Sequence, residues 1–477
     1  MDSSAMLSNP ATDVILHAFD WCYADVMKNA PLIQELGYKS VLVSPAMKSL
    51  RGPKGCDRDS GTQWWQRYQP QDYRVIDNQL GDTQDFTAMV NTLKQHGLRT
   101  YVDVVFNHMA NESGIRGDLT YPNQQDMASY QEDADYYESI RLFGDLSKPL
   151  FDENDFVEAF GIKNWKDTWE VQNGRITGGV SDPGLPTLLD NDNVVAQQRA
   201  YLKALKEIGV KGFRIDAAKH MTLSHLRKVW TDDICEEMHI FGEIITDGGA
   251  TKEEYELFLE PYLKHTRLGA YDFPLFNTIF KSFEEQGSFK SLINPYCFGQ
   301  ALSNMRAITF AVTHDIPNNE VFLDHVMGEV DERLAHAFIL GRDGGVPLVY
   351  SELSTSGILD QNGQPRWLND WQAPYMKNMI QFHNHVHGEA MRVVEANDDL
   401  LVFVRGDKGI VVINKSKRSK TASLTWTGTV TDLLSGAVFD CVDKTLTIQV
   451  ESNQCMMLTT NEFEPVMIPI VVNNWSS

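Results

Sequence analysis

The sequence is poor in the features that mark several protein classes. Its six cysteines include no CxxC pair, so we expect no thiolate metal site. Their even number permits disulfides, and Cys441 and Cys455, in neighbouring strand-like segments, are the one pair that could be bridged. No stretch approaches the roughly 18 apolar residues of a membrane-spanning helix. The opening MDSSAMLSNPATD has neither a basic nor an apolar region, so we expect no signal peptide in this chain.

Positive charge is also scarce. Lys and Arg number 42 against 65 Asp and Glu, which gives a formal net charge of −23. Nucleic acid and anionic membranes would be repelled, so we expect neither as a partner. A neutral substrate fits this balance better, although an acidic surface that serves only solubility fits it equally well. With 477 residues and 42% hydrophobic composition, the chain is long enough for one large domain and one or two smaller ones.

Strand-like and helix-like segments alternate through residues 11–390, which predicts parallel strands joined by helices. The expected strands are Val14–Ala18, Ser40–Pro45, Arg99–His108, Lys211–Asp216, His239–Ile244, Arg306–Asp315 and Val346–Glu352. The expected helices are Thr83–Gly97 with Thr83 as N-cap, Asp190–Gly209, Met221–Trp230, Asp331–Gly341 and Tyr375–His387. About eight such units suit an α/β fold, a (β/α)8 TIM barrel formed by residues 11–108 and 190–390.

Two regions interrupt this alternation. Residues 109–189 are rich in Gly, Asn, Asp and Tyr and poorly periodic, so we expect an inserted domain B after strand 3. From residue 391 to 462, short alternating segments such as LLVFVR and GIVVIN predict a C-terminal antiparallel β-sandwich domain. Residues 463–477 form a tail that reads as the start of a linker.

Charged residues collect where the expected barrel strands end. These positions are Asp103, Asn107, His108, Arg214, Asp216, Glu243, His314 and Asp315. The C-terminal ends of barrel strands form the active site in this fold. A single Asp at such a place is more often a helix cap or a surface charge. The agreement of four strand ends favours one common site.

Four short segments identify a family resemblance. DVVFNH, GFRIDAAKH, FGEII and VTHD resemble, in order, the signature regions of the α-amylase family, glycoside hydrolase family 13. GTQWWQRYQPQDYRV and GLPTLLDNDN are also similar to α-amylases, and the likeness covers roughly residues 11–460. It implies an enzyme that cleaves α-1,4-glucosidic bonds of starch and related glucans with retention of configuration.

The resemblance also assigns catalytic roles. Retention requires a carboxylate nucleophile and a carboxylic acid about 5–5.5 Å apart. By position, Asp216 is the expected nucleophile of a covalent glycosyl-enzyme, Glu243 the general acid/base and Asp315 the third acid. Arg214 lies two residues before Asp216 and so on the same strand face, where its charge would hold Asp216 ionised. Burial and neighbouring carboxylates should raise the pKa of Glu243, and Asp103 should orient its neighbours.

Several further residues match the family's sugar contacts. The expected substrate-binding residues are Trp64, Trp65, Tyr68, His108, Arg214, Lys219, His220 and His314. Tyr68 would stack under the sugar at the cleavage point, and the two histidines of the DVVFNH and VTHD segments would donate to sugar oxygens. Ordinary packing is the alternative for both tryptophans.

The resemblance implies one structural calcium ion and no chloride. Asn107 and Asp190 match side-chain ligands of the family's calcium site, His220 matches a main-chain ligand, and Gln172 is the candidate for a further carbonyl. Thr313 and Leu348 stand where chloride-dependent relatives carry an asparagine and a basic residue. We therefore expect no chloride activation.

An endo-acting α-amylase is the favoured hypothesis. The alternatives within the family are an exo-acting α-glucosidase, a maltogenic amylase and a glucanotransferase. A non-catalytic glucan-binding protein is a further alternative, but such relatives lose carboxylates that this chain keeps. We expect starch, glycogen or malto-oligosaccharides as partners, and a monomer. The size of starch favours an extracellular location over a cytoplasmic one, and the tail could lead to a carbohydrate-binding module.

Overall fold

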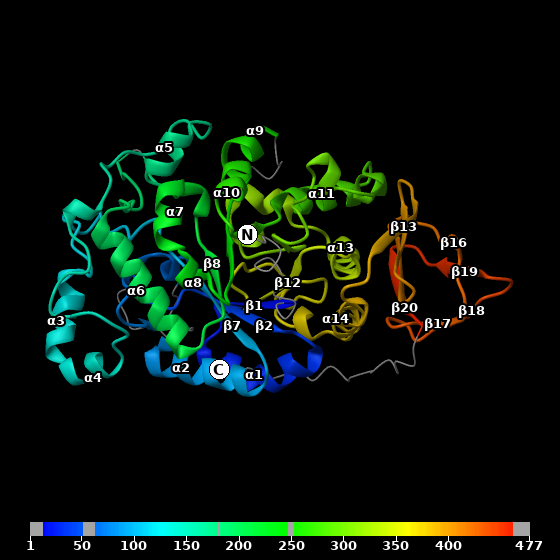
Figure 1. Ribbon diagram of the computed structural model, residues 1–477, viewed down its shortest axis with the longest axis horizontal. Helices are drawn as coiled ribbons and strands as arrows, with labels where there is room; N and C mark the ends of the chain where they lie inside the picture. Colours follow the sequence, from blue (N-terminus) through cyan, green and yellow to red (C-terminus); the bar gives the residue numbers. More distant parts are fainter. Residues whose placement is uncertain (1–12, 51–62, 180, 247–251, 461–477) are drawn as a thin grey trace. The chain divides into compact units, whose positions relative to one another are not determined.

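The computed structural model describes residues 13–50, 63–179, 181–246 and 252–460, and Figure 1 shows their course. The predicted tail, residues 463–477, lies outside this range. The chain forms two compact units. The first unit contains Ala18–Pro31 and the described residues between 39 and 271. The second unit contains Asp13–His17, Leu32–Tyr38 and the described residues between 272 and 460. The predicted division into domains follows other boundaries and remains a prediction.

A closed barrel of eight strands confirms the predicted fold class, and its strands run in the order β1-β12-β11-β10-β9-β8-β7-β2. The strands are β1 (Ile15–Phe19), β2 (Ser40–Val43), β7 (Arg99–Val104), β8 (Gly212–Ile215), β9 (His239–Gly242), β10 (Gly269–Tyr271), β11 (Ala307–Thr309) and β12 (Val346–Glu352). Neighbours such as β7 and β8 pair in parallel. The sequence did not reveal β10, which has only three residues, and β11 ends six residues before the predicted Asp315.

Helices follow the strands along the chain, as predicted. They are α1 (Tyr23–Leu36), α2 (Thr83–Gln95), α6 (Asp192–Ile208), α7 (Leu223–Val229), α8 (Asp232–Cys235), α9 (Lys252–Glu254), α10 (Glu260–His265), α11 (Phe273–Phe283), α12 (Asp315–Asn318), α13 (Glu329–Gly341) and α14 (Pro374–Val386). None of the described helices combines the length and apolar character needed to cross a lipid bilayer.

The N-cap of α2 is Asp82, so the prediction of Thr83 is wrong by one residue. The Asp82 carboxylate accepts from the backbone N–H groups of Gln84 and Asp85 at 2.8 and 3.0 Å. The Asp85 carboxylate in turn accepts from the Asp82 N–H at 3.2 Å, which completes a capping box. The Thr83 hydroxyl donates instead to the carbonyl of Ile140 at 2.6 Å.

The segment between β7 and α6 corresponds to the predicted insertion. It contains α3 (Gln124–Glu132), α4 (Ala134–Ser139) and α5 (Thr168–Asn173) among long loops. The two ends of the segment lie together, because the N–H of Leu188 donates to the carbonyl of Asn107 at 2.9 Å.

The C-terminal part consists of antiparallel sheets, as predicted. Its strands are β13 (Met391–Ala396), β14 (Leu400–Arg405), β15 (Gly409–Asn414), β16 (Lys420–Thr425), β17 (Thr429–Asp432), β18 (Val438–Asp440), β19 (Thr445–Val450) and β20 (Gln454–Thr459). β16 and β19 pair with each other, and the other six form one sheet. Alternate residues such as Val412, Leu424 and Ile448 build a shared core. Cys441 and Cys455 are both free thiols, so the pairing considered for them is wrong.

Gly212, which opens β8, provides a test of barrel packing. A methyl group at this buried position would lie 2.4–2.6 Å from the ring of Tyr101, its partner on β7. Because overpacking of a core costs about 1–3 kcal/mol, we expect Gly212→Ala to lower the free energy of unfolding by that amount in urea denaturation. Gly161→Ala is the matched control, since no atom lies within 4 Å of its added methyl group. Equal stability of the two variants would contradict the proposed packing.

Candidate active site

Arg214 is the centre of a buried charge network in the first unit. Its Nη1 donates to both oxygens of Asp103, at 2.9 and 2.8 Å, and to Oδ1 of Asp216 at 2.8 Å. Its Nη2 donates to Oε1 of Glu243. The guanidinium has no exposed surface. Three strand ends predicted to converge, those of β7, β8 and β9, therefore meet on one cation.

The second oxygen of Glu243 is held by a backbone group that sequence reasoning missed. Oε2 accepts from the N–H of Ala217 at 2.9 Å. Ala217 has a φ of 48°, in the left-handed region that residues other than glycine rarely adopt. Strain of this kind persists at functional sites, where the surroundings enforce it. Nothing in the sequence beyond its place after Asp216 marks Ala217.

Tyr68 and His108 lie beside this network. The Tyr68 hydroxyl donates to Oδ2 of Asp103 at 2.9 Å, and its ring lies 5.8 Å from the Arg214 guanidinium. His108 Nε2 lies 3.0 Å from the Tyr68 carbonyl, which can only accept, so this nitrogen carries a proton and donates it there. The expected contact of His108 with a sugar oxygen stays a prediction. Burial lowers the pKa of His108 to about 4, so the ring is neutral.

The two tryptophans differ in exposure. Trp64 packs against Phe19 and Tyr68, with ring centroids 5.8 and 5.7 Å away, whereas 40% of Trp65 is exposed. An ion pair that the sequence did not suggest positions the short helix Trp64–Tyr68. Arg67 Nε donates to Oδ1 of Asp20, the residue after β1, at 2.6 Å. Asp20 is also a carboxylate at the end of a barrel strand, so the search for charged residues at strand ends could have found it.

Lys219 forms a buried ion pair. Only 8% of the residue is exposed, its Nζ lies 3.3 Å from Oε1 of Glu254, and the same nitrogen lies 4.9 Å from the centre of the Phe258 ring. The expected contact of Lys219 with a bound glucan stays a prediction.

His220 contacts the inserted segment. Its Nδ1 donates to the carbonyl of Val171 at 3.0 Å, and its ring packs edge-on against Trp165. Burial lowers the pKa of His220 to about 4, which keeps the ring neutral. The carbonyl that accepts this hydrogen bond belongs to Val171. Gln172, the candidate for a carbonyl ligand of calcium, is the next residue and lies in the last turn of α5.

The residues expected around calcium fit an oxygen site in type. The N–H of Leu188 donates to the carbonyl of Asn107, so the backbone of Asn107 contacts the inserted segment two residues before Asp190. Burial would raise the pKa of Asp190, but hydrogen bonding to Ser224 and the ammonium of Lys228, 3.2 Å away, outweigh it and lower the pKa. An ionised carboxylate, an amide and nearby carbonyls are the ligands that calcium prefers.

His314 and Asp315 belong to the second unit, described by itself. Both are buried after β11, and His314 Nε2 lies 3.5 Å from Oδ1 of Asp315. The His314 ring packs edge-on against His17 of β1. Their convergence with the Arg214 network stays a prediction. Thr313 and Leu348 are buried and uncharged, and the expectation of no chloride activation also remains a prediction.

The carboxylates around Arg214 compete for one cation. Burial raises the pKa of Asp216 well above its ordinary value; Arg214 opposes this shift, and the charges of Glu243 and Asp103 add to it. Burial likewise raises the pKa of Asp103 to about 6, again against Arg214. Arg214 thus lowers the pKa of Asp216 as expected, but burial and the two neighbouring carboxylates outweigh this effect. Three buried carboxylates with one guanidinium favour retention of a proton within the group.

Comparisons with known proteins identify the family of this chain. The family model "Alpha amylase, catalytic domain" matches residues 25–295. An alpha-amylase from Aeromonas hydrophila is 47% identical over 403 residues, which cover 84% of each chain. One from Thermomonospora curvata is 29% identical over 460 residues, covering 90% of this chain and 69% of the relative.

Solved structures share the fold at lower identity. Wild-type alpha-amylase I from Eisenia fetida superposes with a TM-score of 0.72 at 22% identity, covering 94% of this chain and 98% of that one. The cyclomaltodextrin glucanotransferase CldA superposes with a TM-score of 0.70 at 18% identity, covering 94% of this chain and 99% of that one. With more than half of its residues matched by the family model and a 47% identical relative, the chain belongs to the alpha-amylase family of glycoside hydrolases.

Proposed function

We propose that this protein is an endo-acting α-amylase that hydrolyses α-1,4-glucosidic bonds of starch and related glucans with retention of configuration. One observation supports this most strongly: Asp216 and Glu243 bind adjacent nitrogens of the same guanidinium, that of Arg214. Two carboxyl groups held this near each other suit attack on one anomeric carbon, whereas inverting enzymes need room for a water molecule between them.

In this proposal Asp216 attacks the anomeric carbon and Glu243 protonates the leaving oxygen. Glu243 then removes a proton from the water that releases the sugar. The shared proton of the buried carboxylates supplies the acid that the first step requires. Asp315 is proposed to bind sugar hydroxyls, by the family resemblance.

Trp65 has the exposed ring expected of a sugar contact, which supports binding of a long glucan chain. The alpha-amylase named among the relatives favours hydrolysis of starch over transfer. We further propose that the protein works outside the cell, because starch is too large to enter a cell. We also propose that it is a monomer.

Removal of the acid/base should abolish most turnover. We expect Glu243→Gln to lower kcat on soluble starch by about 10²–10⁴-fold, the usual contribution of general acid–base catalysis. Glu236→Gln, an exposed neutral substitution just before β9, is the control. Near-wild-type turnover of Glu243→Gln would contradict the assigned role.

Early products of the wild-type enzyme test the endo assignment. Mixed oligosaccharides with rapid loss of viscosity are expected on soluble starch, because internal bonds are cut. Glucose or maltose alone would indicate an exo-acting enzyme, and cyclic or elongated products would indicate a glucanotransferase.

The charge of Asp103 should affect the pH profile. Because the negative charge of Asp103 raises the pKa of Asp216, Asp103→Asn should lower that pKa and let the nucleophile ionise at lower pH. We expect the acidic limb of the kcat/KM profile to move to lower pH, together with a lower maximal rate. Tyr68→Phe removes a neighbouring hydroxyl without changing charge and should leave the limb near its wild-type position. A shift to higher pH in Asp103→Asn would refute this account.

We also propose a structural calcium ion held by Asn107, Asp190 and carbonyls near His220, where it would join the inserted segment to the barrel strands of the first unit. A bound ion at about 100 times its Kd stabilises by roughly 2.7 kcal/mol. We therefore expect the calcium chelator EGTA to lower the Tm by about 3 °C, and added calcium to restore it. Asp190→Asn should lose this response, whereas Asp192→Asn, a change of an exposed residue at the start of α6, should keep it. A Tm insensitive to EGTA would exclude the ion.

A further inference from the structure

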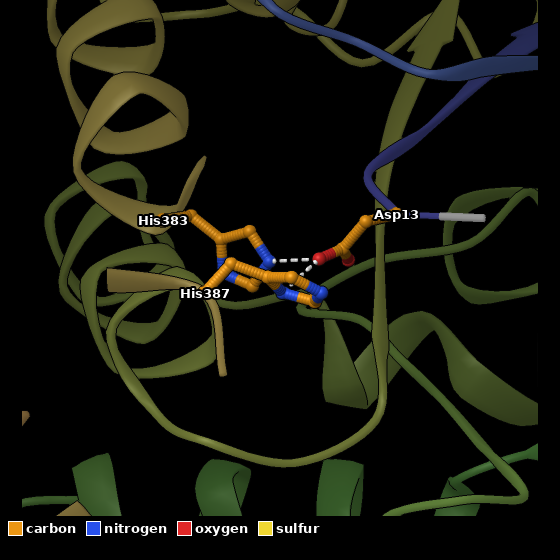
Figure 2. A group of neighbouring side chains, drawn as sticks. All are labelled: Asp13, His383 and His387. Carbon is orange, nitrogen blue, oxygen red and sulfur yellow. Dashed lines mark hydrogen bonds and ion pairs between the residues drawn. The ribbon is translucent and has the colours of Figure 1, made fainter. Parts of the chain in front are cut away.

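A group of three side chains in the second unit has no part in the proposed reaction. It consists of Asp13, His383 and His387 (Figure 2). Asp13 precedes β1 and so lies at the N-terminal end of a barrel strand, whereas the proposed catalytic residues follow C-terminal ends. His383 lies in α14, and His387 follows its last residue. A spacing of four residues places both histidines on one side of the helix end.

The three side chains converge on a single oxygen. Asp13 Oδ2 lies 2.8 Å from Nε2 of His383 and 2.7 Å from Nδ1 of His387. Figure 2 shows both imidazoles turned toward this carboxylate. The three ligand atoms all lie within 4.8 Å of one another. Asp13 and His383 are buried, whereas 48% of the His387 side chain is exposed, which gives a solute access to the group.

Hydrogen bonding orients His383 as a ligand. Its Nδ1 lies 2.8 Å from the carbonyl of Leu340, which can only accept, so Nδ1 carries a proton. In the neutral ring the lone pair is then on Nε2 and points at Asp13 Oδ2. Metal-binding histidines usually donate their other N–H to a carbonyl in this way.

The two contacts of Asp13 are too short for atoms that both act as acceptors. Its Oδ2 lies 2.8 Å from Nε2 of His383 and 2.7 Å from Nδ1 of His387. An oxygen and a nitrogen at this separation repel each other unless a cation lies between them, and a proton or a metal ion can fill that role.

The backbone next to Asp13 is strained in a way that aims this carboxylate. Val14 has a φ of 40°, which is exceptional for a β-branched residue. Its N–H donates to Oδ1 of Asp13 at 3.0 Å, which leaves Oδ2 for the histidines. On the other side, Arg405 donates to the carbonyls of Val386 and Glu389 and so fixes the backbone on both sides of His387. These backbone contacts hold the three side chains close together, and the ligand atoms need to separate only slightly to admit an ion.

We propose that Asp13, His383 and His387 bind one divalent transition-metal ion, with Zn²⁺ as the preferred ion. Two imidazole nitrogens and one carboxylate oxygen form a common three-residue zinc set, with a fourth position left for water. On binding, the ion replaces the protons between the carboxylate and the imidazoles, which pass to solvent. The ion would link the start of β1 to the end of α14 and so stabilise the fold of the second unit. The site differs in ligand type from the proposed calcium site, which is built from oxygens.

The test uses the full chain, stripped of metal by chelation and dialysis and then titrated with zinc chloride alone. Calorimetry should detect the binding of one zinc ion per chain, and this binding should require Asp13, His383 and His387. Zinc should also raise the Tm by several degrees. His387→Gln should weaken that binding more than the roughly 10–100-fold typical for loss of an outer-shell partner. This side chain is half-exposed, so the variant should fold. His385→Gln, a change in the same helix outside the group, is the matched control and should bind as the wild type does.

Cobalt gives an independent readout. Co²⁺ in the same site should produce the intense visible absorption of a tetrahedral complex in the wild type and in His385→Gln, and lose it in His387→Gln. Absence of zinc binding, equal binding in the wild type and His387→Gln, or displacement of the ion by excess calcium would each overturn the proposal. Neither readout depends on enzymatic activity, so failure of the proposed function would leave this test intact.

Discussion

A guanidinium buried among three carboxylates is the constraint on which the described active site depends. Arg214 meets Asp103, Asp216 and Glu243 inside the first unit, where an unpaired charge would cost several kcal/mol. Each carboxylate comes from a different strand end, so pairing with one cation fixes the relative positions of β7, β8 and β9. The same excess of negative charge favours a retained proton. Structural pairing and acid–base chemistry are thus consequences of one arrangement.

Much of the barrel could be predicted because long apolar runs specify buried strands directly. β12 was predicted to the residue as Val346–Glu352. β10 was missed, since three residues carry no periodicity, and it is defined by pairing with β9. In the C-terminal part, alternation revealed β14 and β15. β20 has a mixed composition, QCMMLT, and is a strand because β15 and β17 pair with it on both sides.

The candidate site was predicted best where the side chain itself identifies the chemistry. Strand-end position was enough for Asp103, Arg214, Asp216 and Glu243. Contacts that depend on the backbone or on distant elements were not accessible, such as the Ala217 N–H. The net direction of the Asp216 pKa shift was not predicted, because it depends on the degree of burial and on neighbouring carboxylates that only the folded chain brings near.

Identification of the covalently modified residue tests the central claim most directly. Glu243→Gln would be incubated with an α-maltosyl fluoride, whose fluoride leaves without acid assistance, so the first step proceeds while release of the sugar is slowed. Peptide mass spectrometry should then find one maltosyl group on Asp216, held beside the substituted residue by Arg214. An adduct on another carboxylate, or products of inverted configuration without any adduct, would contradict the assignment.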